Sequence, residues 1–340
     1  MNTPAAVVIL LALLIGPLIL HPIERNFEPY CFLVGVVAVS FGRQWSAALI
    51  AHAAAEPLMI TAAVIVAGLV FGRIRDRLDR TFVRMRRRLS RFTLTAAAVF
   101  AIAILASVIT AIVAALLLVE AVRLMRFDPV KRTTVTVIGC FAIGMGAALT
   151  PIGEPLATLV ASGLHLGFTG LFRLLLPLVL PGIAVLSLAA GWRARGAYEI
   201  STSTAAETPE SSLGAIIQGL KVYLFVAGLA LVSKAFEPLA DHYVPMLGTG
   251  SLYWINLLSA ALDNATLVAV EMHHMPLGRA REVLMSLLIA GGMLIPGNIP
   301  NIVSAGVLRI ASIDWARRGV PVGFALLGIY FAVLLCWNQL

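Results

Sequence analysis

Two long apolar stretches of this chain are each interrupted by a short segment that contains proline, glycine and an oxygen-bearing side chain. The first interruption covers residues 150–155 (TPIGEP), and the second covers residues 295–301 (IPGNIPN). Where a membrane helix is interrupted, unwound carbonyls and polar side chains can bind an ion or a substrate near the middle of the bilayer. The pair of interruptions therefore predicts a membrane carrier with two related binding elements.

Oxygen-bearing side chains near these interruptions have the chemistry of ligands for a small cation. A sodium ion is hard and prefers oxygen, which carbonyl, hydroxyl, amide and carboxylate groups all provide. We predict a first polar cluster that consists of Ser107, Thr110, Thr150, Gly153, Glu154 and Thr158. We predict a second polar cluster that consists of Asp263, Asn264, Thr266, Asn298 and Asn301. Sodium is expected at Asp263, Asn264, Asn298 and Glu154.

The two carboxylates in these clusters allow coupling to protons. A charged carboxylate at the bilayer centre costs from about 2.5 to more than 10 kcal/mol, so Asp263 and Glu154 should be paired, bound to an ion or protonated. A carboxylate that holds a proton in one step and a cation in another makes the two compete for one site. This competition is the simplest mechanism of antiport, and it needs no cofactor beyond the Na⁺ and H⁺ that are transported or coupled.

The composition places the chain in a membrane. Hydrophobic residues make up 60% of the sequence and charged residues only 12%, whereas soluble domains have about 25% charged residues. The mean hydropathy is +0.96. The lipid bilayer and small ions are therefore the expected partners. The three cysteines lie far apart inside apolar segments, without metal-ligand spacing, and are expected to be packing residues.

The net charge of +8 reflects membrane topology rather than binding to nucleic acid. Short loops rich in lysine and arginine stay on the cytoplasmic side of a membrane. We therefore expect a multi-pass protein of the cell inner (plasma) membrane, with cytoplasmic loops at 73–91, 123–132, 193–195 and 309–318.

The apolar stretch 92–122 is flanked by two of these basic loops, which both belong on the same side. About 20 residues cross the hydrocarbon core, so this stretch is too long for one crossing and too short for two full ones. We predict a re-entrant hairpin with its tip near residues 107–110. Near its cytoplasmic end, Glu120 is expected to pair with Arg123 or to reach the membrane surface.

The order of segments recurs after a polar linker, in the opposite orientation. The first repeat, 57–190, contains the hairpin and a broken crossing helix at 133–166. The linker 191–212 is expected to be cytoplasmic and flexible. The second repeat, 213–340, contains a hairpin at 252–272 and a broken helix at 283–308, and residues 1–56 form scaffold or dimerisation helices. The expected fold is an all-α polytopic membrane protein of two inverted-topology repeats.

Two segments resemble a known superfamily. Residues 257–269 (LLSAALDNATLVA) resemble the Ser-Ala-x-x-Asp-Asn-x-x-Leu-Val-Ala element of NhaD-type sodium/proton antiporters, and residues 146–154 (GAALTPIGE) are similar to their Gly-Gly-x-x-Thr-Pro-Ile-Gly-Asp element. These antiporters belong to the ion transporter superfamily, which also holds arsenite and dicarboxylate carriers. Within it, residues 107–112 and 297–301 look most like those of a small group described as cation transporters.

The resemblance extends from about Ile23 to the C-terminus. It implies an elevator-type carrier, as a homodimer, in which hairpins and broken helices move together. One departure is that Thr110 and Ala111 stand where those antiporters often have a second Asp-Asn pair, which implies a weaker or differently used ion site in the first hairpin.

Other functions remain open at the level of the sequence. An enzyme is not expected, because the chain has no His-Glu-x-x-His and no Gly-x-Ser-x-Gly motif. A leak channel, and helix breaks that are only structural kinks, are alternatives. The main rival is a Na⁺- or H⁺-coupled carrier of a small anion, such as a dicarboxylate or an oxyanion, bound at the positive ends of half-helices. The absence of arginine and lysine from both clusters favours a cation.

Overall fold

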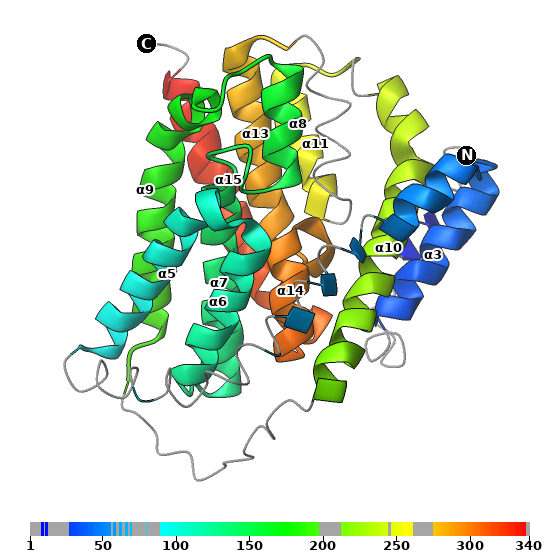
Figure 1. The fold of residues 1–340 in the computed structure, drawn as a ribbon. Coiled ribbons are helices and arrows are strands. Elements are labelled where there is room, and N and C mark those ends of the chain that lie inside the picture. The colour runs from blue at the N-terminus through cyan, green and yellow to red at the C-terminus, as the bar shows by residue number, and fades with distance from the viewer. Residues whose placement is uncertain are drawn as a thin grey trace.

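The protein is a bundle of helices in the computed structural model (Figure 1). The structure describes residues 27–55, 89–196, 212–243, 246–260 and 275–337, together with scattered residues between 8 and 12 and between 57 and 80. These residues form helices and turns, with no strand among them. The fold class is therefore all-α.

Helices α5 (Arg91–Ile109) and α6 (Ala111–Leu124) form a hairpin. They are joined by the single residue Thr110. Figure 1 shows α5 rising to mid-height and α6 returning to the same end. We call this end the basic end, because it carries Arg91, Arg123, Lys131, Arg193 and Arg309. By length alone α5 could cross a membrane, but the chain turns back at Thr110.

The next helices connect the two ends of the bundle. Helix α7 (Pro129–Ala147) starts at the basic end, and after a break helix α8 (Pro155–Gly163) continues to the opposite end. Pro151 and Pro155 lack the N–H groups that a continuous helix would need, which explains why the helix breaks there. Helix α9 (Gly170–Arg193) then returns to the basic end.

The remaining helices begin with α10 (Ser212–Tyr243), which runs toward the opposite end. From that end, α11 (Thr249–Ile255) and the short helix η2 (Asn256–Ala260) descend to mid-height. Helix α13 (Leu277–Gly292) also descends, and the chain continues through η3 (Ile295–Gly297) into α14 (Ile299–Leu308). Helix α15 (Ser312–Trp337) returns to the opposite end.

Helix α3 (Phe27–Gly42) packs on α10 at one side of the bundle (Figure 1). Their backbones approach closely at two glycines, since a Cβ atom on Gly35 would lie 2.6 Å from the carbonyl oxygen of Gly228. Small residues at such crossings are typical of helix packing in membranes. Helix α10 in turn contacts α14 of the main bundle.

The ends of the expected linker 191–212 are helical. Helix α9 continues through Arg193, and α10 already begins at Ser212. A positive charge in the last turn of α9 interacts favourably with the helix dipole, which explains the extension. Residues 197–211 of the linker lie outside the described residues.

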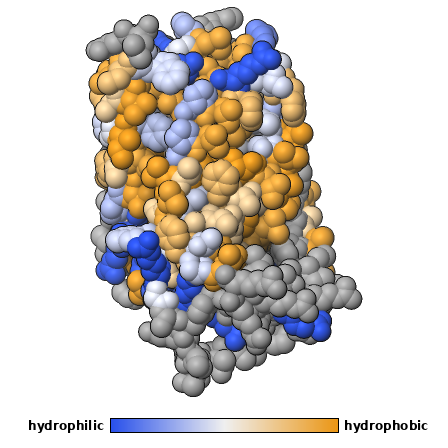
Figure 2. Space-filling view, turned by 90° about the vertical axis from the view of Figure 1, so that its left-hand side faces the viewer, coloured by the Kyte–Doolittle hydropathy of each residue, from blue (hydrophilic) through white to orange (hydrophobic). Residues whose placement is uncertain are grey.

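Among the residues that the structure describes, four helical segments are long and apolar enough to cross a membrane. They are α5, α9, α15 and the part Gly219–Pro238 of α10. Figure 2 shows an apolar band around the middle of one face, with hydrophilic residues above and below it. Together with the composition, these helices make the chain an α-helical membrane protein.

Glu120 lies near the basic end of α6 and is buried. Its Oε2 atom is 3.9 Å from Nη1 of Arg123, one helical turn away. The Nη2 atom of Arg123 donates a hydrogen bond to the carbonyl oxygen of Val307 at 3.2 Å. Arg123 therefore connects the return helix of the hairpin to the end of α14.

Asp128 caps the N-terminus of α7, and its Oδ1 atom accepts a hydrogen bond from the Lys131 amide at 2.9 Å. Partial burial raises the pKa of this carboxyl, but the hydrogen bonds and charge of Lys131 outweigh that effect and hold the pKa below its usual value. Asp128→Ala should lower the free energy of unfolding by about 1 kcal/mol, as losses of N-caps usually do. Asp128→Asn, which keeps the cap, should have a much smaller effect.

The lowered pKa of Asp128 also fixes the sign of a pH effect. The stabilisation that the Asp128 carboxylate provides is complete above the pKa of this carboxyl in the unfolded chain. It is lost as the pH falls through the lower pKa of the folded protein. Thermal melting in detergent should therefore show a smaller gap between wild type and Asp128→Ala at acidic pH. Equal melting temperatures for the two proteins near neutral pH would contradict this role.

Candidate functional site

The tip of the α5–α6 hairpin rests on the break between α7 and α8. The amide of Ala111 donates a hydrogen bond to the carbonyl oxygen of Gly153 at 2.7 Å. The hydroxyl of Thr150 donates to the carbonyl oxygen of Ser107, 43 residues earlier. The first bond joins the backbone of the break to the start of α6, and the second joins the Thr150 side chain to the backbone of α5. Together they hold the hairpin tip against the first interruption.

Thr110 turns the hairpin in a conformation that is unusual for its residue type. Its φ is 75° and its ψ is 151°, a region that is populated almost only by glycine. Holding a β-branched residue there costs about 1–3 kcal/mol, and such strain tends to occur at functional sites. The strain makes the hairpin tip a candidate for a functional position.

The structure brings part of the first cluster together, since Ser107 and Thr110 of the hairpin tip lie against Thr150 and Gly153 of the break. Ser107, Thr150 and Glu154 are buried, and Glu154 immediately precedes α8. Thr158 lies one turn further on and is exposed, but its hydroxyl donates to the carbonyl oxygen of Pro151 at 2.6 Å. Its hydroxyl therefore binds the backbone of the break.

Asn301 holds the second interruption together. Its Nδ2 group donates hydrogen bonds of 2.8 Å to the carbonyl oxygens of Gly291 and Leu294. Both hydrogens of the amide are then used, so the remaining atom must be the acceptor Oδ1. The side chain is completely buried, and none of the described residues donates a hydrogen bond to Oδ1. A buried acceptor oxygen is thus left without a hydrogen bond from the described residues.

Asn298 lies between the two broken helices. It precedes α14 and is buried, and its side chain does not cap the helix. A Cβ atom placed on Gly144 of α7 would lie 2.5 Å from the Nδ2 atom of Asn298, so only glycine leaves room for this amide. Four residues earlier on α7, the Sγ atom of Cys140 contacts Ser304 Oγ at 3.3 Å. Helix α7 therefore contacts the second interruption along one face.

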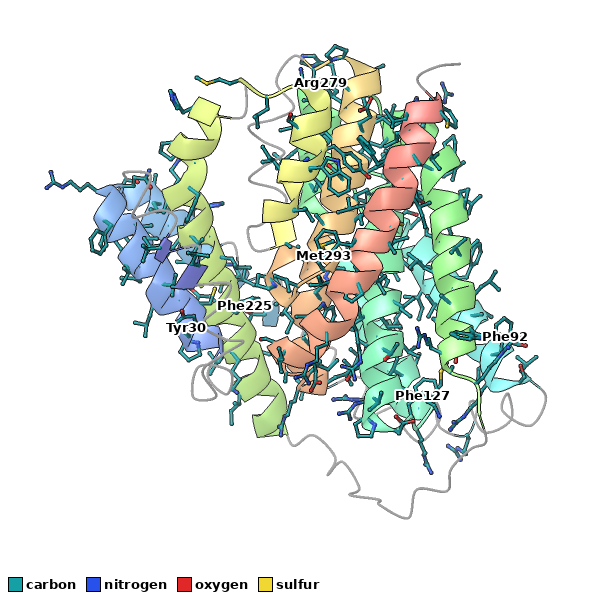
Figure 3. All side chains as sticks on the ribbon, turned by 180° about the vertical axis from the view of Figure 1, so that it is seen from behind. Tyr30, Phe92, Phe127, Phe225, Arg279 and Met293 are labelled. Carbon is teal, nitrogen blue, oxygen red and sulfur yellow. The ribbon has the colours of Figure 1, made fainter. Side chains whose placement is uncertain are left out.

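The depth of the second interruption is visible in Figure 3. Met293, which directly follows α13, lies near mid-height, whereas Arg279 lies at the opposite end. The indole Nε1 of Trp315 donates to the carbonyl oxygen of Gly292 at 3.3 Å, which adds a third side-chain hydrogen bond near this helix end. Among the described residues, η2 also contacts η3 at this level.

The remaining members of the second cluster, Asp263, Asn264 and Thr266, lie outside the described residues, which stop at Ala260 and resume at Met275. Their participation stays a prediction. Of the second cluster, the structure places Asn298 and Asn301 on the same interruption, three residues apart at the start of α14.

A comparison with protein families identifies the family to which the chain belongs. The family described as "Protein of unknown function (DUF1646)" matches residues 3–337. The chain belongs to this family. No curated protein matches the chain. The description of DUF1646 names no activity. The sodium/proton exchange that the resemblance to antiporters implies therefore stays a prediction.

Several buried polar residues of this DUF1646 protein were missed by reasoning from the sequence. Asn256, at the junction of α11 and η2, donates to Ser286 Oγ of α13 at 2.8 Å, and Ser286 donates to the Val283 carbonyl. Asn256 stands only a few residues before Asp263 in an apolar stretch, which was a usable signal. Gly144 and Cys140 carried none, because a glycine and a cysteine in a membrane helix are ordinary packing residues.

Proposed function

We propose that this DUF1646 protein is a secondary active carrier of a small monovalent cation, and that it exchanges sodium for protons. The observation that carries the proposal is the buried Oδ1 atom of Asn301, which is left open by the described residues at a broken helix. An unmet acceptor in a buried site costs about 1–3 kcal/mol, and a cation satisfies it directly.

The balance of groups in the clusters supports a cation over an anion. The side chains supply carboxylate, amide and hydroxyl oxygens, and neither cluster includes a lysine or an arginine. The ends of α7 and α13 add backbone carbonyls, which are the negative ends of their helix dipoles. The positive ends of α8 and α14 lie at the same two breaks, so an anion carrier is the alternative that the experiments below separate.

Proton coupling is assigned to Glu154 in the first cluster and to Asp263 in the second. Glu154 is buried and sits at the break beside Thr150 and Gly153. A carboxylate removed from water is stable either with a proton or with a cation beside it. Proton and cation therefore exclude each other, and release of one on either side of the membrane permits binding of the other.

The movement that carries the site across the membrane is proposed to be of the elevator type. The hairpin at α5–α6 reaches the middle from the basic end, while α11 and α13 reach it from the opposite end (Figure 1). This arrangement is compatible with two inverted repeats that supply one interruption each. The α3–α10 pair, beside the bundle, is proposed to be the scaffold and the dimer contact, with the basic end cytoplasmic.

The substitution Glu154→Gln tests the proposed coupling between sodium movement and proton movement. Glutamine keeps the shape of the side chain but cannot bind and release a proton, so the sodium-driven pH change in proteoliposomes should fall at least about tenfold. The purified variant should still elute as a folded protein. Glu237→Gln is the matched control, because Glu237 lies on α10 and pairs with Lys234 away from both clusters. Wild-type coupling in Glu154→Gln would remove this residue from the mechanism.

A further inference from the structure

Cationic side chains from two helices converge where α9 ends at the basic end. Arg193 is the last residue of α9, and Arg195 follows two residues later; both are exposed. The Nζ atom of Lys131, from the start of α7, lies 3.4 Å from the position of a Cβ atom on Gly196. We call Lys131, Trp192, Arg193 and Arg195 the α9 corner.

Aromatic rings hold the arginines of this corner in place. The guanidinium carbon of Arg195 lies 4.9 Å from the centroid of the Phe92 ring, and that of Arg193 lies 5.2 Å from the centroid of the Trp192 ring. Contacts of this kind are worth about 0.5–1 kcal/mol at exposed sites and restrict the side chain. The edge of each guanidinium remains available, because stacking occupies only its face.

The charge of the corner stays positive when the carboxylate that pairs with Lys131 is counted. The carboxylate of Asp128 lies 3.3 Å from the Lys131 ammonium and offsets it. Arg91 adds a further positive charge nearby, with its guanidinium carbon 5.5 Å from the Phe127 ring centroid. Figure 3 shows Phe92 and Phe127 at the same end of the molecule. Arg193 and Arg195 therefore determine the net charge of the α9 corner, which has two positive charges at one edge of the apolar band.

An apolar stripe runs from the corner along the outer face of α9. Val185, Leu188 and Trp192 are 60%, 54% and 55% exposed, and their spacing of three and four residues puts them on one face. Figure 2 views this side of the molecule and shows the apolar band reaching the hydrophilic residues below it. A tryptophan at the lower end of the stripe is placed where tryptophans mark the membrane surface.

We propose that the α9 corner binds the headgroup of an anionic phospholipid, with an acyl chain along the stripe of α9. Arginine binds a phosphate oxygen pair with two parallel hydrogen bonds, and anionic headgroups gather at basic sites on the cytoplasmic surface. A lipid fits better than a soluble phosphate, because the charged corner and the apolar stripe are continuous. This site is independent of the carrier function proposed above.

Native mass spectrometry of the purified protein tests the site. With equal amounts of phosphatidylglycerol and phosphatidylcholine, wild type should retain phosphatidylglycerol in excess. The double variant Arg193→Gln/Arg195→Gln should lower the retained phosphatidylglycerol about tenfold, since each lost charge-assisted contact weakens binding several-fold. Both residues are exposed, so the variant should fold, which its melting temperature checks.

The control for this test is Arg281→Gln, which removes the same kind of contact elsewhere. The guanidinium carbon of Arg281 lies 5.2 Å from the centroid of the Trp337 ring, on α13 and α15 near the opposite end. This variant should retain phosphatidylglycerol as wild type does. Equal retention of the two lipids by wild type, or no loss in the double variant, would overturn the proposal. Displacement of the lipid by millimolar glycerol 3-phosphate would assign the corner to soluble phosphates instead.

Discussion

Replacing Asn301 with alanine should destabilise the protein by about 2–5 kcal/mol, because the carbonyls of Gly291 and Leu294 would each lose a buried hydrogen bond. The change also removes Oδ1, the acceptor that the described residues leave open. We therefore expect two losses from one substitution, a lower melting temperature and a lost response to sodium.

Melting in detergent with and without sodium separates these two losses. A ligand that binds only the folded protein raises the free energy of unfolding by RT ln(1 + [L]/Kd), so sodium should raise the melting temperature of wild type. Asn301→Ala should melt lower and show no sodium response. Ser304→Ala is the control, since Ser304 lies one turn later on α14 and is equally buried, and its hydroxyl accepts a hydrogen bond from Cys140 Sγ on α7. A sodium response that survives in Asn301→Ala would remove Asn301 from the cation site.

Gly146→Val should have the largest effect on folding. Gly146 lies in the last turn of α7 against α5, and a Cβ atom there would lie 1.8 Å from the carbonyl oxygen of Ala103. Because the obstacle is backbone, one of the two helices must move. We expect a loss of about 4 kcal/mol or more, since overpacking would be joined by the loss of the hairpin contacts with Gly153 and Thr150.

The matched control for this substitution is Gly167→Val. Gly167 lies in the turn between α8 and α9, and apart from its two chain neighbours none of the described residues has a heavy atom within 4 Å of its Cβ position. Its stability should stay within about 0.5 kcal/mol of wild type, as for most surface changes. The yield of monodisperse protein from size-exclusion chromatography and the melting temperature both measure the difference. Wild-type yield and melting temperature for Gly146→Val would show that α5 does not pack here as described.

The places where helices turn or break carry strong local signals. Residues 91–124 are apolar on all sides, so their periodicity does not reveal a turn, yet the basic residues at both ends require the chain to return. The tip was expected near residues 107–110, and the structure turns at Thr110. Proline and glycine predict where α7 and α13 end, because they remove backbone donors or helix stability locally.

The contacts between these helices and breaks leave no comparable local pattern in the sequence. The hydrogen bond from Thr150 to Ser107 depends on how two helices cross, and the space that Gly144 leaves for Asn298 depends on the absence of a side chain. The double role of Asn301 is also tertiary, because its partners lie on α13 and in the break. The sequence therefore predicts the polar residues near each break, and packing decides which of them meet.

Proton movement in proteoliposomes tests the proposed carrier most directly. The purified wild-type protein is reconstituted with a pH-sensitive dye inside, the membrane potential is clamped, and sodium is added outside. We expect a saturable, sodium-dependent rise in internal pH that is absent from empty liposomes and strongly reduced in Glu154→Gln. A folded wild-type protein that gives no pH change at any sodium concentration would contradict sodium/proton exchange and direct attention to sodium-coupled anions.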